Sequence, residues 1–124
     1  MNIISTPHAP EAIGPYSQGT VTGNLLFTSM QIPIDPENGD MPEGIEPQTF
    51  QVLMNLKAIA KAAGSSMHKA VKITVYMQDL NDFKAMNRVY AEFFPVDSPA
   101  RAAVEVDRIP KDVLVAMDAI FEIA

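Results

Sequence analysis

Apolar residues recur along this chain with two different periods. From Val71 to Met77 every second residue is a large apolar one, and a period of two places alternate side chains on opposite faces of a β-strand. Between Leu53 and Ala63 the apolar residues recur instead every three or four positions, which is the spacing along one face of an α-helix. The pattern therefore predicts a chain that combines strands with helices.

Two short strands are expected near the start of the chain, at residues 17–23 and 24–32. Gly23 and Asn24 join them, and both residues tolerate the positive φ that a tight hairpin turn requires. The stretch 33–47 is rich in Pro, Gly, Asp and Glu, so we expect it to be a loop.

Two helices are expected, one on each side of the alternating segment 69–77. The first begins near Pro47, because proline fits the first turn of a helix, and Gly64 is its expected stop. The second has Asn81 as a plausible cap and ends at Pro95. Its apolar face is expected to contain Phe83, Met86, Tyr90 and Phe93 or Phe94.

Two more strands, near 101–107 and 113–123, close the chain. The predicted order is ββαβαββ, and both helices carry an apolar stripe. We therefore expect them to pack together on one face of the sheet and to give an α+β fold. No repeat or linker interrupts the pattern, so residues 1–124 are expected to form a single domain.

Composition and charge exclude several classes of function. The formal net charge is −6 and the lysines are scattered, so we expect no nucleic-acid partner, because phosphate binding relies on clustered Lys and Arg. The chain has no cysteine, which excludes disulfides and thiolate metal sites, and we expect no metal. No signal peptide is visible and no apolar run approaches the ~18 residues that span a bilayer. A soluble cytoplasmic protein without a membrane partner is expected.

Arg101 is the residue that most needs a chemical explanation. It opens an apolar strand directly after Pro99 and Ala100, and a buried guanidinium needs a partner. Its planar fork suits a carboxylate held by two parallel hydrogen bonds. Two partners stay open: Asp118 or Glu105 of the protein itself, or an anionic ligand.

Tyr16 is a second candidate, because the rigid turn Gly14-Pro15 presents its phenol at the rim of a loop. A turn followed by a packed aromatic side chain explains the same residues equally well. Phosphate-cradling glycine motifs are absent from the sequence. Ser29 and the other serines lack the His and Asp pattern of a hydrolase triad.

Six segments of the chain resemble the RidA/YjgF family, which was formerly grouped under the name endoribonuclease L-PSP. They are AIGPYSQ (12–18), TSMQIP (28–33), NLKAI (55–59), DLNDF (79–83), PAR (99–101) and IPK (109–111). The resemblance implies a homotrimer of chorismate-mutase-like α+β subunits, each with a mixed sheet of about six strands and two helices on one face. It also implies three clefts between neighbouring chains and cofactor-free hydrolysis of reactive 2-imino acids to 2-keto acids and ammonia.

The same resemblance implies roles for particular residues. Arg101 would clamp the substrate carboxylate, and Tyr16 of the adjacent subunit would line the cleft. Ser29 and Asn87 would help to shape the cleft. The backbone groups that would touch the imine end lie near Met30 and Ala103.

The chain departs from the family pattern at three of these positions. Met30 stands where the family usually has glycine, and Ala103 stands where the best-known members have cysteine. The glutamate that positions water in the family falls at Ala116. Asp118 lies on the same strand face, but about 6.6 Å further along the strand.

Three functions therefore stay open. The first is a hydrolytic deaminase of 2-imino or enamine acids, with the substrate carboxylate held by Arg101. The second is a trimer that binds or senses a small 2-imino or 2-keto acid without catalysis, because Ala116 replaces the glutamate. The third is a ribonuclease, for which the acidic charge and the lack of a histidine pair offer no obvious means.

Overall fold

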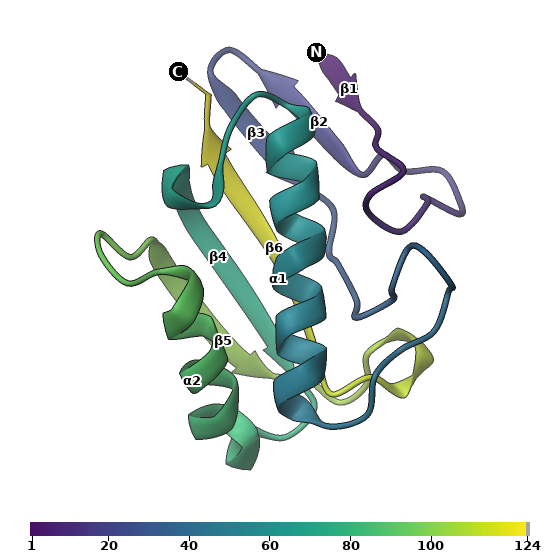
Figure 1. Cartoon of the computed structure of the whole chain (residues 1–124), viewed down its shortest axis with the longest axis vertical. Coiled ribbons are helices and arrows are strands. Elements are labelled where there is room, and N and C mark those ends of the chain that lie inside the picture. The colour runs from purple at the N-terminus through teal and green to yellow at the C-terminus, as the bar shows by residue number, and fades with distance from the viewer. Residues whose placement is uncertain (124) are drawn as a thin grey trace.

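Six strands form one mixed sheet in the computed structural model, which describes residues 1–123. They are β1 (Asn2–Ile4), β2 (Gly19–Thr22), β3 (Leu25–Thr28), β4 (Ala70–Met77), β5 (Ala100–Glu105) and β6 (Val115–Glu122). Their order across the sheet is β1-β2-β3-β6-β4-β5 (Figure 1). The pair β4 and β5 is parallel, and the other neighbouring pairs are antiparallel. The predicted α+β fold with a mixed sheet is confirmed.

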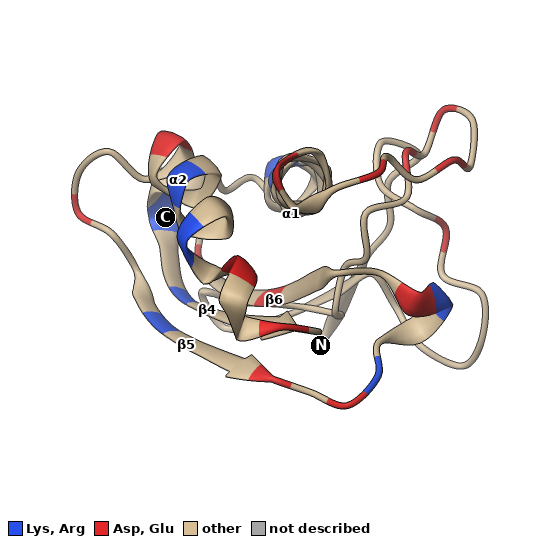
Figure 2. Ribbon diagram, turned by 90° about the horizontal axis from the view of Figure 1, so that it is seen from below, with Lys and Arg blue, Asp and Glu red and all other residues tan. Residues whose placement is uncertain are grey.

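Two helices, α1 (Ile45–Ala62) and α2 (Phe83–Phe93), cover one face of this sheet (Figure 2). Pro47 lies in the first turn of α1, and Gly64 follows the end of α1 with a φ of 81°, as predicted. Short 3-10 turns lie at Met67–Lys69, Leu80–Asp82 and Pro110–Asp112. No helix within residues 1–123 has both the length and the apolar character needed to cross a membrane.

The core lies between the two helices and the sheet. The alternation in β4 has the predicted effect, because Ile73, Val75 and Met77 are fully buried on the face that the helices cover. Neighbouring β6 adds Val115, Met117, Ala119 and Phe121 to the same face. The opposite face carries no helix and is called the open face below. The residues of β4 and β6 on the open face include Thr74, Tyr76, Ala116 and Asp118.

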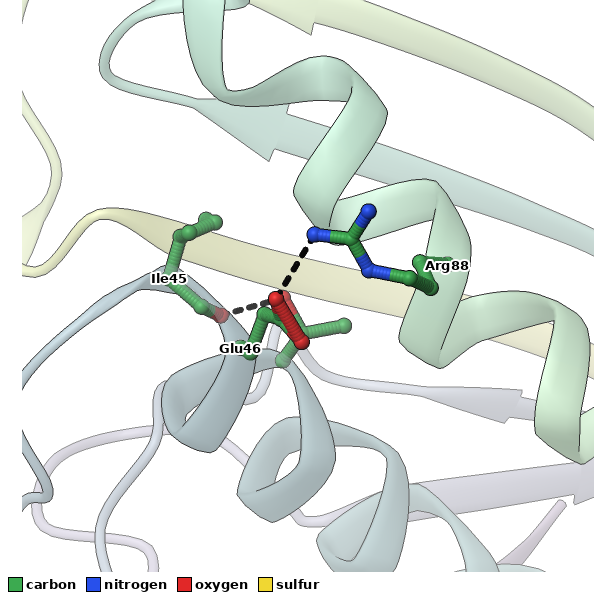
Figure 3. Close-up of polar contacts among 4 residues, drawn as sticks. Ile45, Glu46 and Arg88 are labelled. Atoms are coloured by element: carbon green, nitrogen blue, oxygen red, sulfur yellow. Dashed lines mark hydrogen bonds and ion pairs between the residues drawn. The ribbon is translucent and has the colours of Figure 1, made fainter.

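Contacts between the helices hold α2 beside α1. Arg88 of α2 pairs with Glu46 in the first turn of α1, with 2.8 Å between Nη2 and Oε1 (Figure 3). The rings of Phe50 and Phe93 pack with their centroids 5.6 Å apart. These contacts lie above the core and fix α2 over the edge of the sheet that β5 forms (Figure 2).

Two local expectations differ from the structure. The sequence did not predict β1, because three residues are too few to show a period of two, and β1 owes its place to antiparallel pairing with β2. The prediction that Asn81 caps the second helix is wrong. Asn81 lies inside the 3-10 turn, where its N–H donates to the side chain of Asp79, and α2 begins only at Phe83.

Candidate active site

Arg101 lies on β5, the edge strand beneath α2. It pairs in register with Ile73 of β4, so its side chain extends on the face that the helices cover. Its Nη1 atom donates a hydrogen bond to Oδ1 of Asn87 at 2.6 Å. The guanidinium carbon lies 4.7 Å from the centroid of the Tyr90 ring and 5.2 Å from that of Phe83. Three side chains of α2 therefore hold the guanidinium.

The side chain of Arg101 is exposed in the single chain, although the strand that it opens is apolar. An edge strand has a neighbour on one side alone, and α2 covers only part of the residue. Exposure removes the desolvation cost that a buried guanidinium would carry. The positive charge of Arg101 is therefore accessible to a small anion.

Neither carboxylate considered as a partner pairs with Arg101 within the chain. Asp118 extends on the open face, with the sheet between it and the guanidinium. Glu105 accepts a hydrogen bond from the backbone N–H of Leu80 at 2.9 Å. The alternative in which Asp118 or Glu105 neutralises Arg101 within one chain is therefore not observed: the sheet separates Asp118 from Arg101, and Glu105 lies four residues further along the same strand face.

The other two arginines of the chain do have carboxylate partners. Arg88 pairs with Glu46 at 2.8 Å, and Arg108 pairs with Asp112 at 3.6 Å. Within residues 1–123, Arg101 is the arginine that forms no ion pair. A neutral amide and two aromatic rings hold its side chain and leave its charge uncompensated.

Tyr90 is almost fully buried beneath Arg101, with 5% of its surface exposed. Its hydroxyl group finds no hydrogen-bond partner within the described part of the chain. Burial raises the pKa of the Tyr90 phenol, and the positive charge of Arg101 opposes this shift. A buried tyrosine usually satisfies its hydroxyl group, so hydrogen bonding does not explain why this residue is a tyrosine.

Tyr16, Ser29 and Met30 lie together elsewhere in the fold, where they line a cavity of about 450 Å³. Tyr16 is half exposed in the loop before β2. Ser29 follows the end of β3 and donates its hydroxyl hydrogen to the backbone carbonyl of Ser17. Other residues of this cavity include Ile13, Ile32, Ile34, Pro110 and Lys111. Its walls are mainly apolar, and its polar side chains are those of Glu11, Tyr16, Ser29, Gln31 and Lys111.

Ala103 and Ala116 lie on opposite faces of the sheet. Ala103 of β5 pairs with Val75 and shares the face of Arg101. Ala116 of β6 is fully buried on the open face, where it packs in a small cluster with Ile109 and Val113. The alanine side chain at this position cannot accept a proton, and its buried neighbours are apolar.

Asp118, the acidic residue of β6 nearest to Ala116, already has a hydrogen-bond partner. The Tyr76 hydroxyl donates to its Oδ2 atom at 2.7 Å. This hydrogen bond is the main reason that the pKa of Tyr76 is raised to about 12. Within residues 1–123 no three His, Cys, Asp or Glu side chains form a group that could hold a metal ion.

The structure thus divides the candidate residues other than Ala116 into two groups. Arg101, Asn87 and Ala103 lie at the β5 edge, whereas Tyr16, Ser29 and Met30 lie around the end of β3. Strands β6 and β4 separate β3 from β5, a distance of roughly 14 Å at the usual strand spacing. One chain alone does not bring the two groups together.

Sequence reasoning missed the contacts of Phe83 and Tyr90 with Arg101. Both residues were assigned only to the apolar face of the second helix. A signal was present, since positions 83, 87 and 90 are separated by four and three residues and so share one helical face. What the sequence could not show is that the edge strand places Arg101 under that face.

Comparison with known proteins places the chain among close relatives. The family model described as Endoribonuclease L-PSP matches residues 6–123. A RutC family protein of Pyrococcus horikoshii is 56% identical, over 95% of this chain and 94% of the relative. The 2-iminobutanoate/2-iminopropanoate deaminase of Escherichia coli K12 is 48% identical, over 94% of both chains.

Solved structures agree with these matches along the whole chain. Escherichia coli TdcF with bound serine superimposes with a TM-score of 0.97 at 44% identity, and the match covers 100% of both chains. The YjgF gene product of Escherichia coli gives a TM-score of 0.96 at 46% identity, with 98% of both chains covered. Sequence and fold therefore point to the same group of proteins.

Proposed function

Because the chain belongs to the RidA/YjgF family, we propose that it hydrolyses reactive 2-imino acids to 2-keto acids and ammonia. Arg101 would hold the carboxylate of the substrate. The observation that carries the proposal is that Arg101 forms no ion pair within residues 1–123 while α2 holds its guanidinium in place. Relatives at 48% identity bear the name of such a deaminase.

The proposed reaction needs little chemical assistance. Water adds to the carbon of the C=N bond, a proton reaches the nitrogen, and the resulting carbinolamine releases ammonia and leaves the keto group. Two parallel hydrogen bonds from Arg101 to the carboxylate would fix the imine carbon relative to the incoming water. Orientation of this kind lowers the barrier without any ionised base.

We place the reacting site between two chains of a homotrimer. The two groups of candidate residues lie too far apart within one chain to touch one small substrate. A neighbouring copy could bring its Tyr16, Ser29 and Met30 to the exposed side of Arg101. The exposure of both Arg101 and Tyr16 in the single chain supports this arrangement.

A second function is favoured by Ala116. This position is apolar and fully buried, and Asp118 is engaged by Tyr76. Loss of a general base typically lowers a rate by about 10²–10⁴. A trimer that binds a small 2-keto or 2-imino acid without turning it over therefore remains the alternative.

Turnover of 2-iminobutanoate distinguishes the two functions. The imine is generated in place by a pyridoxal-phosphate-dependent threonine dehydratase, and its loss is followed with and without the protein. We expect the protein to accelerate the loss, and Arg101→Ala to return it to the uncatalysed rate. The non-catalytic alternative would be supported if the protein and Arg101→Ala both left the loss at the uncatalysed rate, while the protein bound a keto acid and Arg101→Ala did not.

A further inference from the structure

One face of α2 holds the guanidinium of Arg101 from several sides. Asn87 accepts a hydrogen bond from Nη1. The rings of Tyr90 and Phe83 lie within cation–π distance of the guanidinium carbon, at 4.7 and 5.2 Å. The hydrogen bond occupies only one of the five N–H donors of an arginine side chain, so donors remain for a carboxylate.

Holding Arg101 in place matters because the side chain is exposed on an edge strand. A free arginine samples many rotamers, and ordering them on binding opposes association. Stacking on an aromatic ring uses the flat faces of the guanidinium and leaves its edges for hydrogen bonds. The contacts with α2 therefore order the side chain before the ligand arrives.

Tyr90 is the most firmly placed of the three supports. It is almost fully buried, and the ring of Phe94 packs against it with centroids 4.8 Å apart. Its hydroxyl group makes no hydrogen bond within residues 1–123. The ring, and not the hydroxyl, is thus the part of Tyr90 that contacts Arg101.

We infer that Tyr90, together with Phe83, is a positioning residue that holds Arg101 in the orientation that receives the substrate carboxylate. The inference rests on the proposed function, because it assigns the carboxylate to Arg101. It goes further in naming which rings set the affinity and in stating that the phenolic oxygen of Tyr90 is dispensable for it.

The test compares Tyr90→Leu with Tyr90→Phe. Binding of 2-oxobutanoate is measured by isothermal titration calorimetry, and KM and kcat are measured with 2-iminobutanoate. Removal of the ring in Tyr90→Leu should weaken binding by about 3- to 30-fold and should raise KM more than it lowers kcat. Tyr90→Phe keeps the ring, so its Kd should stay within about twofold of the unchanged protein.

Phe50→Leu is the matched control, because this exposed ring of α1 contacts Phe93 and lies away from Arg101. Its Kd should not change. Phe83→Leu is the second test variant, since Phe83 is only partly buried and lies at the margin of the core. Phe83→Leu should also weaken binding, which keeps the inference testable if Tyr90→Leu does not fold.

The outcomes separate this inference from the proposed function. If the unchanged protein fails to bind 2-oxobutanoate, the role of Arg101 itself is wrong. If the protein binds it and Arg101→Ala does not, an unaltered Kd in folded Tyr90→Leu or Phe83→Leu overturns the positioning role alone. Equal weakening in Tyr90→Phe and Tyr90→Leu would also overturn it, because the hydroxyl group would then be the effective part.

Discussion

Arg101 donates a hydrogen bond of 2.6 Å to the side-chain oxygen of Asn87, a neutral partner, although the chain is rich in acidic residues. A carboxylate in the place of this amide would neutralise the guanidinium. An amide orients the guanidinium and leaves its charge free to attract an anion. The choice of partner is what distinguishes Arg101 from Arg88 and Arg108, which both pair with carboxylates.

Asn87→Asp should therefore weaken the binding of 2-oxobutanoate by about fivefold or more. The new carboxylate has nearly the shape of the amide but pairs with Arg101 and repels the ligand. The melting temperature should stay the same or rise slightly, because an exposed ion pair adds little to stability. Calorimetry and thermal unfolding measure the two quantities.

Asn81→Asp adds the same charge in the exposed 3-10 turn before α2, and it should leave the Kd nearly unchanged. If both variants weakened binding equally, general repulsion by the added negative charge would explain the loss. A Kd for Asn87→Asp equal to that of the unchanged protein would show that the ligand does not meet Arg101.

Ala116→Glu should destabilise the fold. The position is fully buried beside Ile109 and Val113, so a longer side chain must displace its neighbours at a cost of about 1–3 kcal/mol. Burial would also raise the pKa of the new carboxyl group. Chemical unfolding of the variant measures the loss of stability.

Ala91→Glu makes the same substitution on the exposed side of α2 and should change stability little. A free energy of unfolding for Ala116→Glu as high as that of Ala91→Glu would mean that position 116 has room for a carboxylate. The apolar packing of the open face around Ala116 would then be incorrect.

Tyr76→Phe should change how stability depends on pH above neutrality. The hydrogen bond to Asp118 raises the pKa of Tyr76 to about 12, compared with about 10 for a free phenol. The folded chain thus holds the phenolic proton more tightly than the unfolded chain does. This contribution is fully present below about pH 10 and is lost as the pH rises through about 12.

The free energy of unfolding of the protein should therefore exceed that of Tyr76→Phe by an amount that shrinks between about pH 10 and 12. Lysine titration is common to both proteins and cancels in the difference. Asp118→Asn, which removes the charged acceptor, should reduce the same contribution. A constant difference across this range would contradict the account of the Tyr76 and Asp118 pair.

Much of the fold could be predicted because the segments that show a helix or strand period are long and regular. Alternation through Ile73, Val75 and Met77, and the stops at Gly64 and Pro95, depend on local sequence alone. The short strand β1 and the 3-10 turn around Asn81 could not be predicted, because pairing with β2 and the Asp79 side chain decide them.

The candidate site was less accessible to sequence reasoning. Alternation placed Arg101 and Asp118 each on a face of its own strand, but it could not say whether the two faces coincide. That depends on the pairing of β5 and β6 with β4, which places the two charges on opposite sides of the sheet. The same pairing brings Arg101 under Tyr90, a contact between distant segments that no local pattern encodes.

Binding of 2-oxobutanoate to the protein, to Arg101→Ala and to Arg108→Ala tests the central claim most directly. Arg108 is the matched control, because it is an exposed arginine in the loop that follows β5 and has its own partner in Asp112. Titration calorimetry should show binding by the protein and by Arg108→Ala, and at least about tenfold weaker binding by Arg101→Ala. Equal affinity for all three proteins would contradict the claim that Arg101 receives the carboxylate.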